Sequence, residues 1–313
     1  MNIIIPKEFQ DSDIDTISVA DSGVSEYVET NTYSLNDQVY VKDIFPPKLY
    51  TALGAVATYV YPPDNPDSWT DNGCPNRWKF LDEYITTQTV SPTYDTDLVI
   101  QVKSNLQNSL ALFGITGTNL KIEVLDGSDT IISNQTIEID LINKSAIIDW
   151  ETYFFSSFLY TEDLTHEIIL LHSSKVKITI SSDSSGIVPA LGSLVLGESC
   201  RIGYTQYNIK SKIIDFSTIE TNSYGDLWVN QGKYAKKMEL ETQDNGYRYD
   251  IINRALIAIR GKLTVFEGNN EFDDSTCNTD FSAFRVLGII QDYSLSLAEG
   301  NVTKGSFTIR GIT

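Results

Sequence analysis

Short runs of alternating apolar and polar residues, separated by turn sequences, fill the middle of this chain. Seven runs lie between residues 97 and 181: DLVIQVKS, SLALFGI, LKIEVLD, TIISNQTIEID, SAIIDWETYFF, EIILLHS and KVKITIS. Turn sequences between them include Gly117-Thr118-Asn119, Asp126-Gly127-Ser128 and Asn143-Lys144. Alternation places one face of each strand in a core, and short strands at regular intervals are typical of antiparallel sandwiches. We therefore predict a mainly β protein with a β-sandwich over residues 79–200.

The last third of the chain has a different pattern. RIGYTQYNIKSKIIDFS and DLWVNQGKYAKKMELET alternate as paired strands would, with a polar turn at 223–225 between them. The stretch YDIINRALIAIRGK places Ile251, Ile252, Ala255, Leu256 and Ile259 on one helical face. KLTVFEG, FRVLGIIQDYSLSLA and KGSFTIRGI return to strand patterns. Residues 201–313 therefore form a predicted β-β-α-β-β-β domain with one α-helix, whose strands can extend a sheet into a neighbouring subunit during assembly.

The first 78 residues divide into two predicted parts. Residues 1–30 carry seven acidic residues, one lysine and few large apolar residues, which indicates an extended acidic arm. Residues 31–78 hold short strand patterns, turn sequences and many aromatic residues, which indicates a small compact β module.

Motifs in this module and in the sandwich resemble two carbohydrate-binding folds. TYSLNDQVY, LYTA and PDSW resemble the chitin-binding modules of carbohydrate-binding family 5/12, which use exposed aromatic rings as platforms for sugars. The resemblance implies a site for host surface glycan; the candidate rings are Tyr33, Tyr40, Tyr50, Trp69 and Trp78. The alternative is that these rings form the module's core. ALFGITGTNLKIEVLDG, with VKITIS and GSLVLG, resembles galactose-binding-like jelly rolls, and implies that topology for the sandwich.

The stretch GCPNRWKFLDEYITTQT, residues 73–89, joins the two units. We interpret Pro75, Asn76, Arg77 and Trp78 as an interdomain corner: proline stiffens the turn, Trp78 packs on the sandwich, and Arg77 donates to carbonyls or to an acid such as Asp82. The alternative is a ligand-facing Arg-Trp pair.

The corner and several later motifs resemble a family of tailed-bacteriophage virion proteins. The motifs are TQT at 87–89, GYTQY at 203–207, IIDFS at 213–217, GKYAK at 232–236, GIIQDYSLS at 288–296 and SFTIRGI at 306–312. The resemblance is to minor tail and tail-tip proteins with distal-tail-like, ring-forming subunits. It implies a structural role in the virion tail after synthesis in the host cytoplasm, as a homo-oligomer such as a hexamer, with the tail tube, tail hub and fibres as partners. A peripheral carbohydrate-binding adhesin or receptor-binding protein and a capsid decoration protein remain open alternatives.

Several function classes lack their signatures. GxSxG, HExxH, P-loop and GxGxxG motifs are all missing, so we expect no enzyme and no cofactor. The histidines, His166 and His172, and the cysteines, Cys74, Cys200 and Cys277, show no metal-ligand spacing, and we expect neither a metal site nor a disulfide framework.

The charge of the chain limits its partners. A formal net charge of −19 opposes direct nucleic-acid binding, and no apolar run approaches the roughly 20 residues that a membrane-spanning helix needs. If the protein lines a tail channel, we expect Asp226, Glu239, Glu241 and Asp244 to face the lumen and repel DNA. The alternative is that these acids are ordinary solvated surface.

Overall fold

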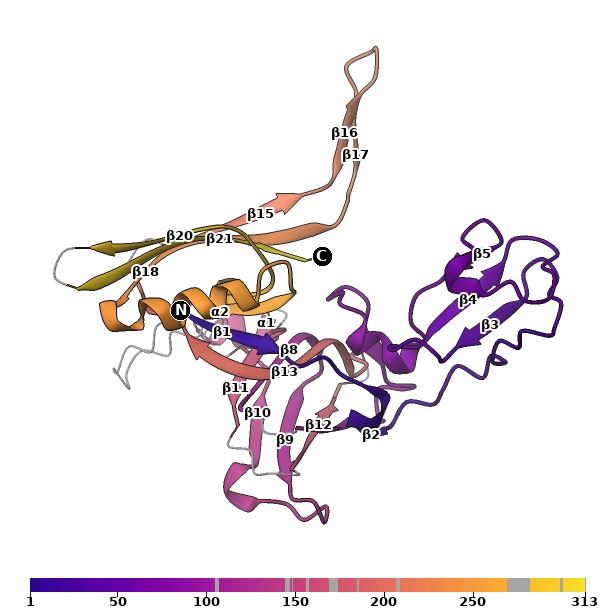
Figure 1. Ribbon diagram of the computed structural model, residues 1–313, viewed down its shortest axis with the longest axis horizontal. Helices are drawn as coiled ribbons and strands as arrows, with labels where there is room; N and C mark the ends of the chain where they lie inside the picture. The colour runs from indigo at the N-terminus through magenta and orange to yellow at the C-terminus, as the bar shows by residue number, and fades with distance from the viewer. Residues whose placement is uncertain are drawn as a thin grey trace.

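A computed structural model describes residues 1–104, 107–143, 147, 149–155, 158–168, 174–184, 186–206, 209–268, 282–298 and 301–312. It is mainly β, with 47% strand and 13% helix, which confirms the predicted fold class. Figure 1 shows a body of curled sheets from which two parts project, a small module around β3–β5 and a hairpin made by β16 and β17.

One eleven-stranded antiparallel sheet forms the backbone of the body. In spatial order its strands are β11 (Leu164–Glu167), β8 (Ser109–Thr116), β13 (Ala190–Arg201), β1 (Asn2–Pro6), β19 (Thr264–Glu267), β20 (Arg285–Ala298), β21 (Val302–Gly311), β18 (Tyr234–Asn245) and β14 (Tyr204–Thr205). Two strands lie off this path, β6 (Thr89–Val90) on β13 and β15 (Lys210–Asp215) on β18. Strands from the predicted sandwich and from the predicted C-terminal domain thus share one sheet. The predicted boundary at residue 200 falls inside β13, so the backbone has no break there.

The N-terminal segment corrects the prediction of an acidic arm. β1 lies between β13 and β19, where Ile3 pairs with Cys200 on one side and Phe266 on the other. The side chains of Ile3 and Ile4 are buried. The acidic residues follow this short apolar strand, and averaging the charge over 30 residues concealed it.

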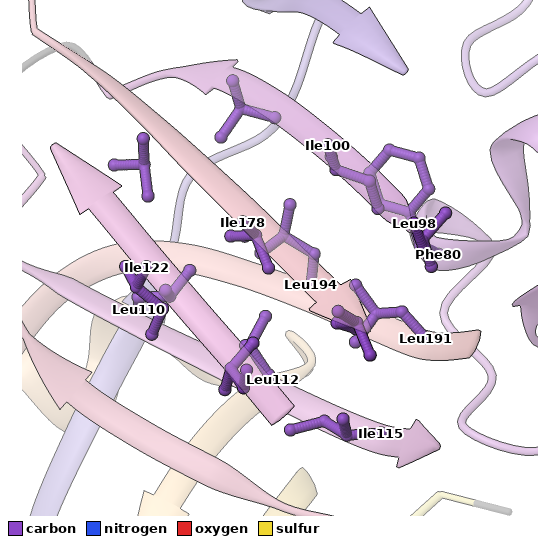
Figure 2. Packing of buried hydrophobic residues seen from close by; sticks show 14 of the residues in the cluster. Phe80, Leu98, Ile100, Leu110, Leu112, Ile115, Ile122, Ile178, Leu191 and Leu194 are labelled. Atoms are coloured by element: carbon purple, nitrogen blue, oxygen red, sulfur yellow. The ribbon is translucent and has the colours of Figure 1, made fainter. Parts of the chain in front are cut away.

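A second, five-stranded sheet completes the sandwich. Its order is β10 (Ile137–Asp140), β9 (Asn119–Leu125), β12 (Lys175–Ser181), β7 (Leu98–Lys103) and β2 (Ile14–Ile17). Alternation decides the packing: Val176, Ile178 and Ile180 are fully buried, while the residues between them are partly exposed. These residues share one core cluster with apolar residues of β8 and β13, such as Leu112 and Leu194, and Figure 2 shows Ile178 beside Leu194. The predicted sandwich is present, and β2 from the N-terminal segment adds to it.

The predicted helix is α2 (Tyr249–Ala258), and it covers the other half of the large sheet. Ile252 and Leu256, with Ile259 just after the helix, pack in a core that includes Phe266 and Phe307. Ile251 was expected on the same face but is 55% exposed. The remaining short helices are η1 (Asp11–Asp13), η2 (Pro62–Asp64), η3 (Asn76–Leu81), η4 (Ser133–Gln135), η6 (Gly246–Arg248) and η7 (Ser282–Phe284).

One predicted strand is a helix. Within SAIIDWETYFF, the residues Trp150–Phe155 form α1, which corrects the strand prediction. The stretch lacks alternation, and a helical turn brings Trp150 onto Phe154, with ring centroids 5.9 Å apart.

The small module has its own three-stranded sheet, in the order β3 (Gln38–Val41), β4 (Lys48–Ala52) and β5 (Trp69–Asp71). Its core is separate from that of the sandwich and holds Val39, Val41, Tyr50, Ala52, Val56 and Trp69. A core this small depends on its large aromatic residues for most of its buried apolar area.

Candidate assembly surface

The rings predicted to bind sugar lie inside cores. Trp69 is 2% exposed, and its Nε1 donates to the carbonyl oxygen of Val60 at 3.1 Å. Its ring packs edge-on against Tyr33, with centroids 5.2 Å apart, and against Tyr27. Tyr33 is half-buried, and its hydroxyl accepts from the backbone N–H of Val28. Trp69 is therefore a core residue of the small module.

Tyr40, Tyr50 and Trp78 are buried as well. Burial raises the pKa of Tyr40 to about 12. A sugar stacks on an open aromatic face, and four of the five candidate rings offer none. The platform predicted from Tyr33, Tyr40, Tyr50, Trp69 and Trp78 is therefore corrected to a set of core residues.

The corner at residues 75–78 makes structural contacts. Asn76 exchanges two hydrogen bonds with the backbone of Val90, its Nδ2 donating to the carbonyl at 2.8 Å and its Oδ1 accepting from the N–H at 3.0 Å. Arg77 Nη1 donates to the carbonyl of Val19 at 3.0 Å. Trp78 packs edge-on against Phe45 of the small module. Asp82 was one expected partner of Arg77, but it accepts from Thr87 Oγ1 at 2.6 Å instead.

Beyond the sheet edge, β15 and β18 continue into a hairpin that leaves the body (Figure 1). We call residues 216–233 the arm; it holds β16 (Thr218–Thr221) and β17 (Leu227–Asn230), and every residue of both strands is exposed. The turn is ordered: Asn222 Oδ1 accepts from the N–H groups of Tyr224 and Asp226, both at 2.9 Å. Gly225 supplies the turn's positive φ of 90°.

The arm has one apolar face. Residues directly opposite each other in an antiparallel pair share a face, so Ile219, Val229 and Leu227 lie together with Thr221. These three apolar side chains are 63–67% exposed. The other face carries Thr218, Glu220, Trp228 and Asn230. A two-stranded hairpin is at best marginally stable in water, so an exposed apolar face on one indicates a surface that another layer covers.

An apolar groove lies at the foot of the arm. Tyr84, Phe216, Ala235, Ile289 and Ile312 contribute its apolar lining. Two cations stand beside it: Lys233 Nζ lies 5.8 Å from the centre of the Tyr84 ring, and the Arg310 guanidinium lies 5.9 Å from that of Phe216. We call this the foot groove. Gly232 permits its shape, since an added Cβ would meet the Phe216 carbonyl oxygen at 2.4 Å.

A buried ionic network lies in a second, adjoining cleft. Arg285 is 2% exposed; its Nη1 donates to the Asp163 carbonyl at 2.5 Å, and its Nε donates to Thr165 Oγ1 at 3.0 Å. Thr165 donates in turn to Glu267, and Lys236 pairs with the Asp163 carboxylate at 2.6 Å. The network joins β11 to β18, β19 and β20. Lys236 pairs with Asp163 and Arg285 pairs with Glu267, so each cation has a carboxylate partner. The network therefore stabilises the contact between these parts of the large sheet.

The acids predicted to face a channel lie in different surroundings. Asp244 is buried and pairs with Arg248 at 2.6 Å. Glu239 accepts from Lys212 and pairs with Lys237, and the hydrogen bond from Lys212 is the largest cause that lowers its pKa to about 2. Glu241 is exposed, and Asp226 lies at the tip of the arm. Asp244 and Glu239 are therefore paired within the chain and are not free to repel DNA, while a channel-facing position of Glu241 and Asp226 stays a prediction.

A second exposed apolar surface surrounds α1. Trp150, Tyr153, Phe154 and Phe155 are each 49–86% exposed, and the Tyr153 ring packs edge-on against Phe158. Sequence reasoning missed this surface because it assigned the stretch to a strand. The available signal was composition, since residues 150–158 contain five aromatic residues.

The described residues contain no group of three or more histidine, cysteine, aspartate or glutamate side chains able to hold a metal. His166 is partly buried, and burial lowers its pKa. Cys74 and Cys200 are free thiols. His172 and Cys277 lie outside the described residues. Across the described ranges, no helix is long and apolar enough to cross a membrane.

No family model matches this chain, and neither a curated protein nor a solved structure matches it. The arm and the foot groove are therefore the features from which a function can be argued.

Proposed function

We propose that this protein is a non-enzymatic structural component of a tailed-phage virion, at the tail tip or baseplate, where it assembles with other subunits through its arm. One observation carries the proposal: a hairpin projects from the sheet edge with Ile219, Leu227 and Val229 exposed on one face. Exposing these apolar side chains to water does not stabilise an isolated chain. A subunit gains buried apolar area when a neighbour covers them.

The sheet edge beside the arm supports the same role. Among the described strands, β15 pairs only with β18, and its residues are almost all exposed. An unpaired strand edge can accept a strand from a neighbour. Lys210 and Lys212 on this edge discourage unselective pairing, as charged residues do on natural sheet edges.

The phage assignment itself rests on the dispersed motifs around residues 73–89 and 203–312 and on the acidity of the chain. A net charge of −19 suits a particle component that must not bind the genome. We propose no catalytic role, because the buried charges in the cleft beside the foot groove are paired with one another. A glycan-binding role has little support, because four of its five candidate rings are buried.

Purified particles test the proposal. We expect mass spectrometry to find the chain in gradient-purified virions, and antibody-gold labelling to place it at the end of the tail. Gold on the head would favour a capsid decoration protein instead. Absence of the chain from purified particles would overturn the proposal.

A further inference from the structure

The strand β15 presents free backbone hydrogen-bonding groups at the outer edge of the large sheet. It pairs with β18 without a register shift, and Phe216 continues the same register by donating its backbone N–H to the carbonyl of Lys233. Hydrogen-bonded and non-hydrogen-bonded pairs alternate along an antiparallel ladder, so the backbone of each even-numbered residue of β15 turns toward β18. The N–H and carbonyl groups of Ser211, Ile213 and Asp215 therefore point away from the sheet.

This edge has no cover within the described part of the chain. The outward N–H and carbonyl groups of Ser211, Ile213 and Asp215 have no backbone partner among the described residues. At 71%, the side chain of Ile213 is more exposed than that of any other described leucine, isoleucine or valine. Between Lys210 and Asp215 there is neither a proline nor a bulge, two devices that keep natural sheet edges from pairing. The edge is therefore open to a further strand.

We propose that β15 pairs antiparallel with β15 of a second copy, about a twofold axis through Ile213, so that two large sheets join into one. The occupant is the same strand because its sequence complements itself in this register. Ile213 faces Ile213 of the second copy, Ser211 faces Asp215, and Lys212 faces Ile214. Apolar side chains then meet on the axis, and each Asp215 carboxylate lies opposite a hydroxyl that can donate to it. The inference rests on the proposed assembly role and names the partner strand.

Backbone geometry and charge favour this register over its neighbours. Residues that face each other across an antiparallel ladder both point toward it or both point away, so the axis passes through a residue and not between two. An axis through Lys212 would place two lysines directly opposite each other, which destabilises a strand pair. An axis through Ser211 or Ile214 leaves three residues of β15 in the ladder (210–212 or 213–215), against five (211–215) for an axis through Ile213.

The charge nearest the axis is already paired within its own chain. Lys212 Nζ lies 2.8 Å from Glu239 Oε1, so a second copy meets an ion pair and not a free ammonium group. Asp215 accepts from the hydroxyl and the backbone N–H of Ser217, and the described residues offer it no cation. Two copies can therefore approach along this edge without bringing unpaired like charges face to face.

Disulfides between copies test the register. Facing residues of a hydrogen-bonded pair have Cα atoms about 5.5 Å apart, which lies within the range that a disulfide spans. After oxidation at high protein concentration, we expect Ile213→Cys to cross-link with itself and Ser211→Cys to cross-link with an isotope-labelled Asp215→Cys copy. Ser211→Cys should not cross-link with itself, because the two positions lie four residues apart along the ladder, about 13 Å. Peptide mass spectrometry identifies each disulfide.

Charge variants on the axis give a readout without added cysteines. Sedimentation velocity of the parent protein should show a concentration-dependent species of about twice 35.0 kDa. Ile213→Asp and Ile213→Lys each place like charges on the axis, and each should raise the dimer's Kd about tenfold or more through repulsion and lost apolar contact. An equimolar mixture of the two variants places opposite charges on the axis and should restore the dimer.

The matched controls are Ile219→Asp and Ile219→Lys, which make the same changes on the arm at a side chain that is 67% exposed. They should leave the Kd unchanged. Both isoleucines are exposed, so the variants should fold, which circular dichroism checks. A parent protein that stays monomeric at high concentration overturns the inference, as does a dimer that Ile213→Asp leaves intact. A 211–211 disulfide that forms as readily as the 211–215 disulfide overturns it too.

The two proposals fail in different ways. If the chain is found in virions but β15 does not pair with itself, the assembly role stands and the inference about its partner strand is wrong. If the dimer forms but the chain is missing from particles, the twofold contact stands and the phage role is wrong.

Discussion

At the scale of single residues, the same aromatic side chain takes opposite positions in this molecule. Trp69 is 2% exposed at the centre of the small module, whereas Trp228 is 77% exposed on the arm. Neighbouring sequence did not separate them, because both stand near the start of a short strand, Trp69 first in β5 and Trp228 second in β17. Burial depends on what packs above the strand, which local sequence does not encode.

Replacement of Trp69 by alanine should unfold the small module selectively. It removes a buried ring and its hydrogen bond to Val60, a loss of about 3–5 kcal/mol for a well-packed tryptophan. Hydrogen exchange should show lost protection over β3–β5 while β18–β21 keep theirs. The matched control is Trp228→Ala, which should change stability by about 0.5 kcal/mol or less. Equal effects of the two substitutions would contradict the assignment of Trp69 to the core.

Cys74 should resist alkylation in the native protein. Burial raises its pKa from 9.0 to about 11, so at pH 8 its thiolate population is about a hundredfold below that of an ordinary thiol. Peptide mass spectrometry after timed iodoacetamide treatment would measure the rate. We expect rapid labelling once denaturant unfolds the chain. Native labelling as fast as in denaturant would show that the corner opens in solution.

At the scale of elements, local alternation was enough where a strand buries alternate residues in a core. β7, β9 and β12 were predicted for that reason, and α2 from its helical period. β1 was missed because averaging the charge over residues 1–30 concealed its short apolar run. α1 was missed because a six-residue aromatic segment fits neither period. For the candidate site, the hairpin turn and β17 were predicted, whereas β16 at 218–221 lies just beyond the predicted run 201–217. The exposure of both strands was not predicted, since exposure follows from the absence of a covering layer.

The base of the arm should weaken in acid through Glu239. Its pKa is lowered from 4.5 to about 2 by hydrogen bonds from Lys212 and Lys237 on the β15–β18 ladder. A depressed carboxylate pKa stabilises the fold above the unfolded value of 4.5, and this contribution is lost as pH falls toward 2.

A pH series of thermal unfolding would measure this contribution. Glu239→Gln should lower the midpoint at pH 6 and match the parent protein near pH 2. Lys212→Met should reproduce part of the difference, and added salt should shrink it because the pair is solvent-exposed. A difference that stays constant from pH 6 to pH 2 would rule out this ion pair as its cause.

At the scale of the whole molecule, one buried arginine forms hydrogen bonds with segments that lie far away in the sequence. Arg285 on β20 donates to Asp163 and Thr165 beside and on β11, and Thr165 donates to Glu267 on β19. Nothing in the sequence distinguished Arg285 from the other arginines. Its role comes from the eleven-stranded sheet, which brings these segments together.

Arg285→Met should lower the free energy of unfolding by about 3 kcal/mol or more, because it leaves buried polar partners without their donor. Urea titration would measure the loss, and the exposed Arg260 offers a matched control, with an expected change of about 0.5 kcal/mol or less for Arg260→Met. Similar losses for both substitutions would mean that the network contributes little to holding the sheet together.

The place of β1 has a consequence for the order in which the molecule is made. A ribosome delivers residues 2–6 before their hydrogen-bonding partners at 197–201 and 265–267, which are made about 190 and about 260 residues later. Until then, both edges of this apolar strand lack their partners in the nascent chain. The strands of the sandwich between 98 and 181 are already complete by that time and can pair with one another. Such late closure is slow and exposes the chain to aggregation. β1 is thus synthesised well before both of its partners, and its insertion between them joins the two halves of the large sheet.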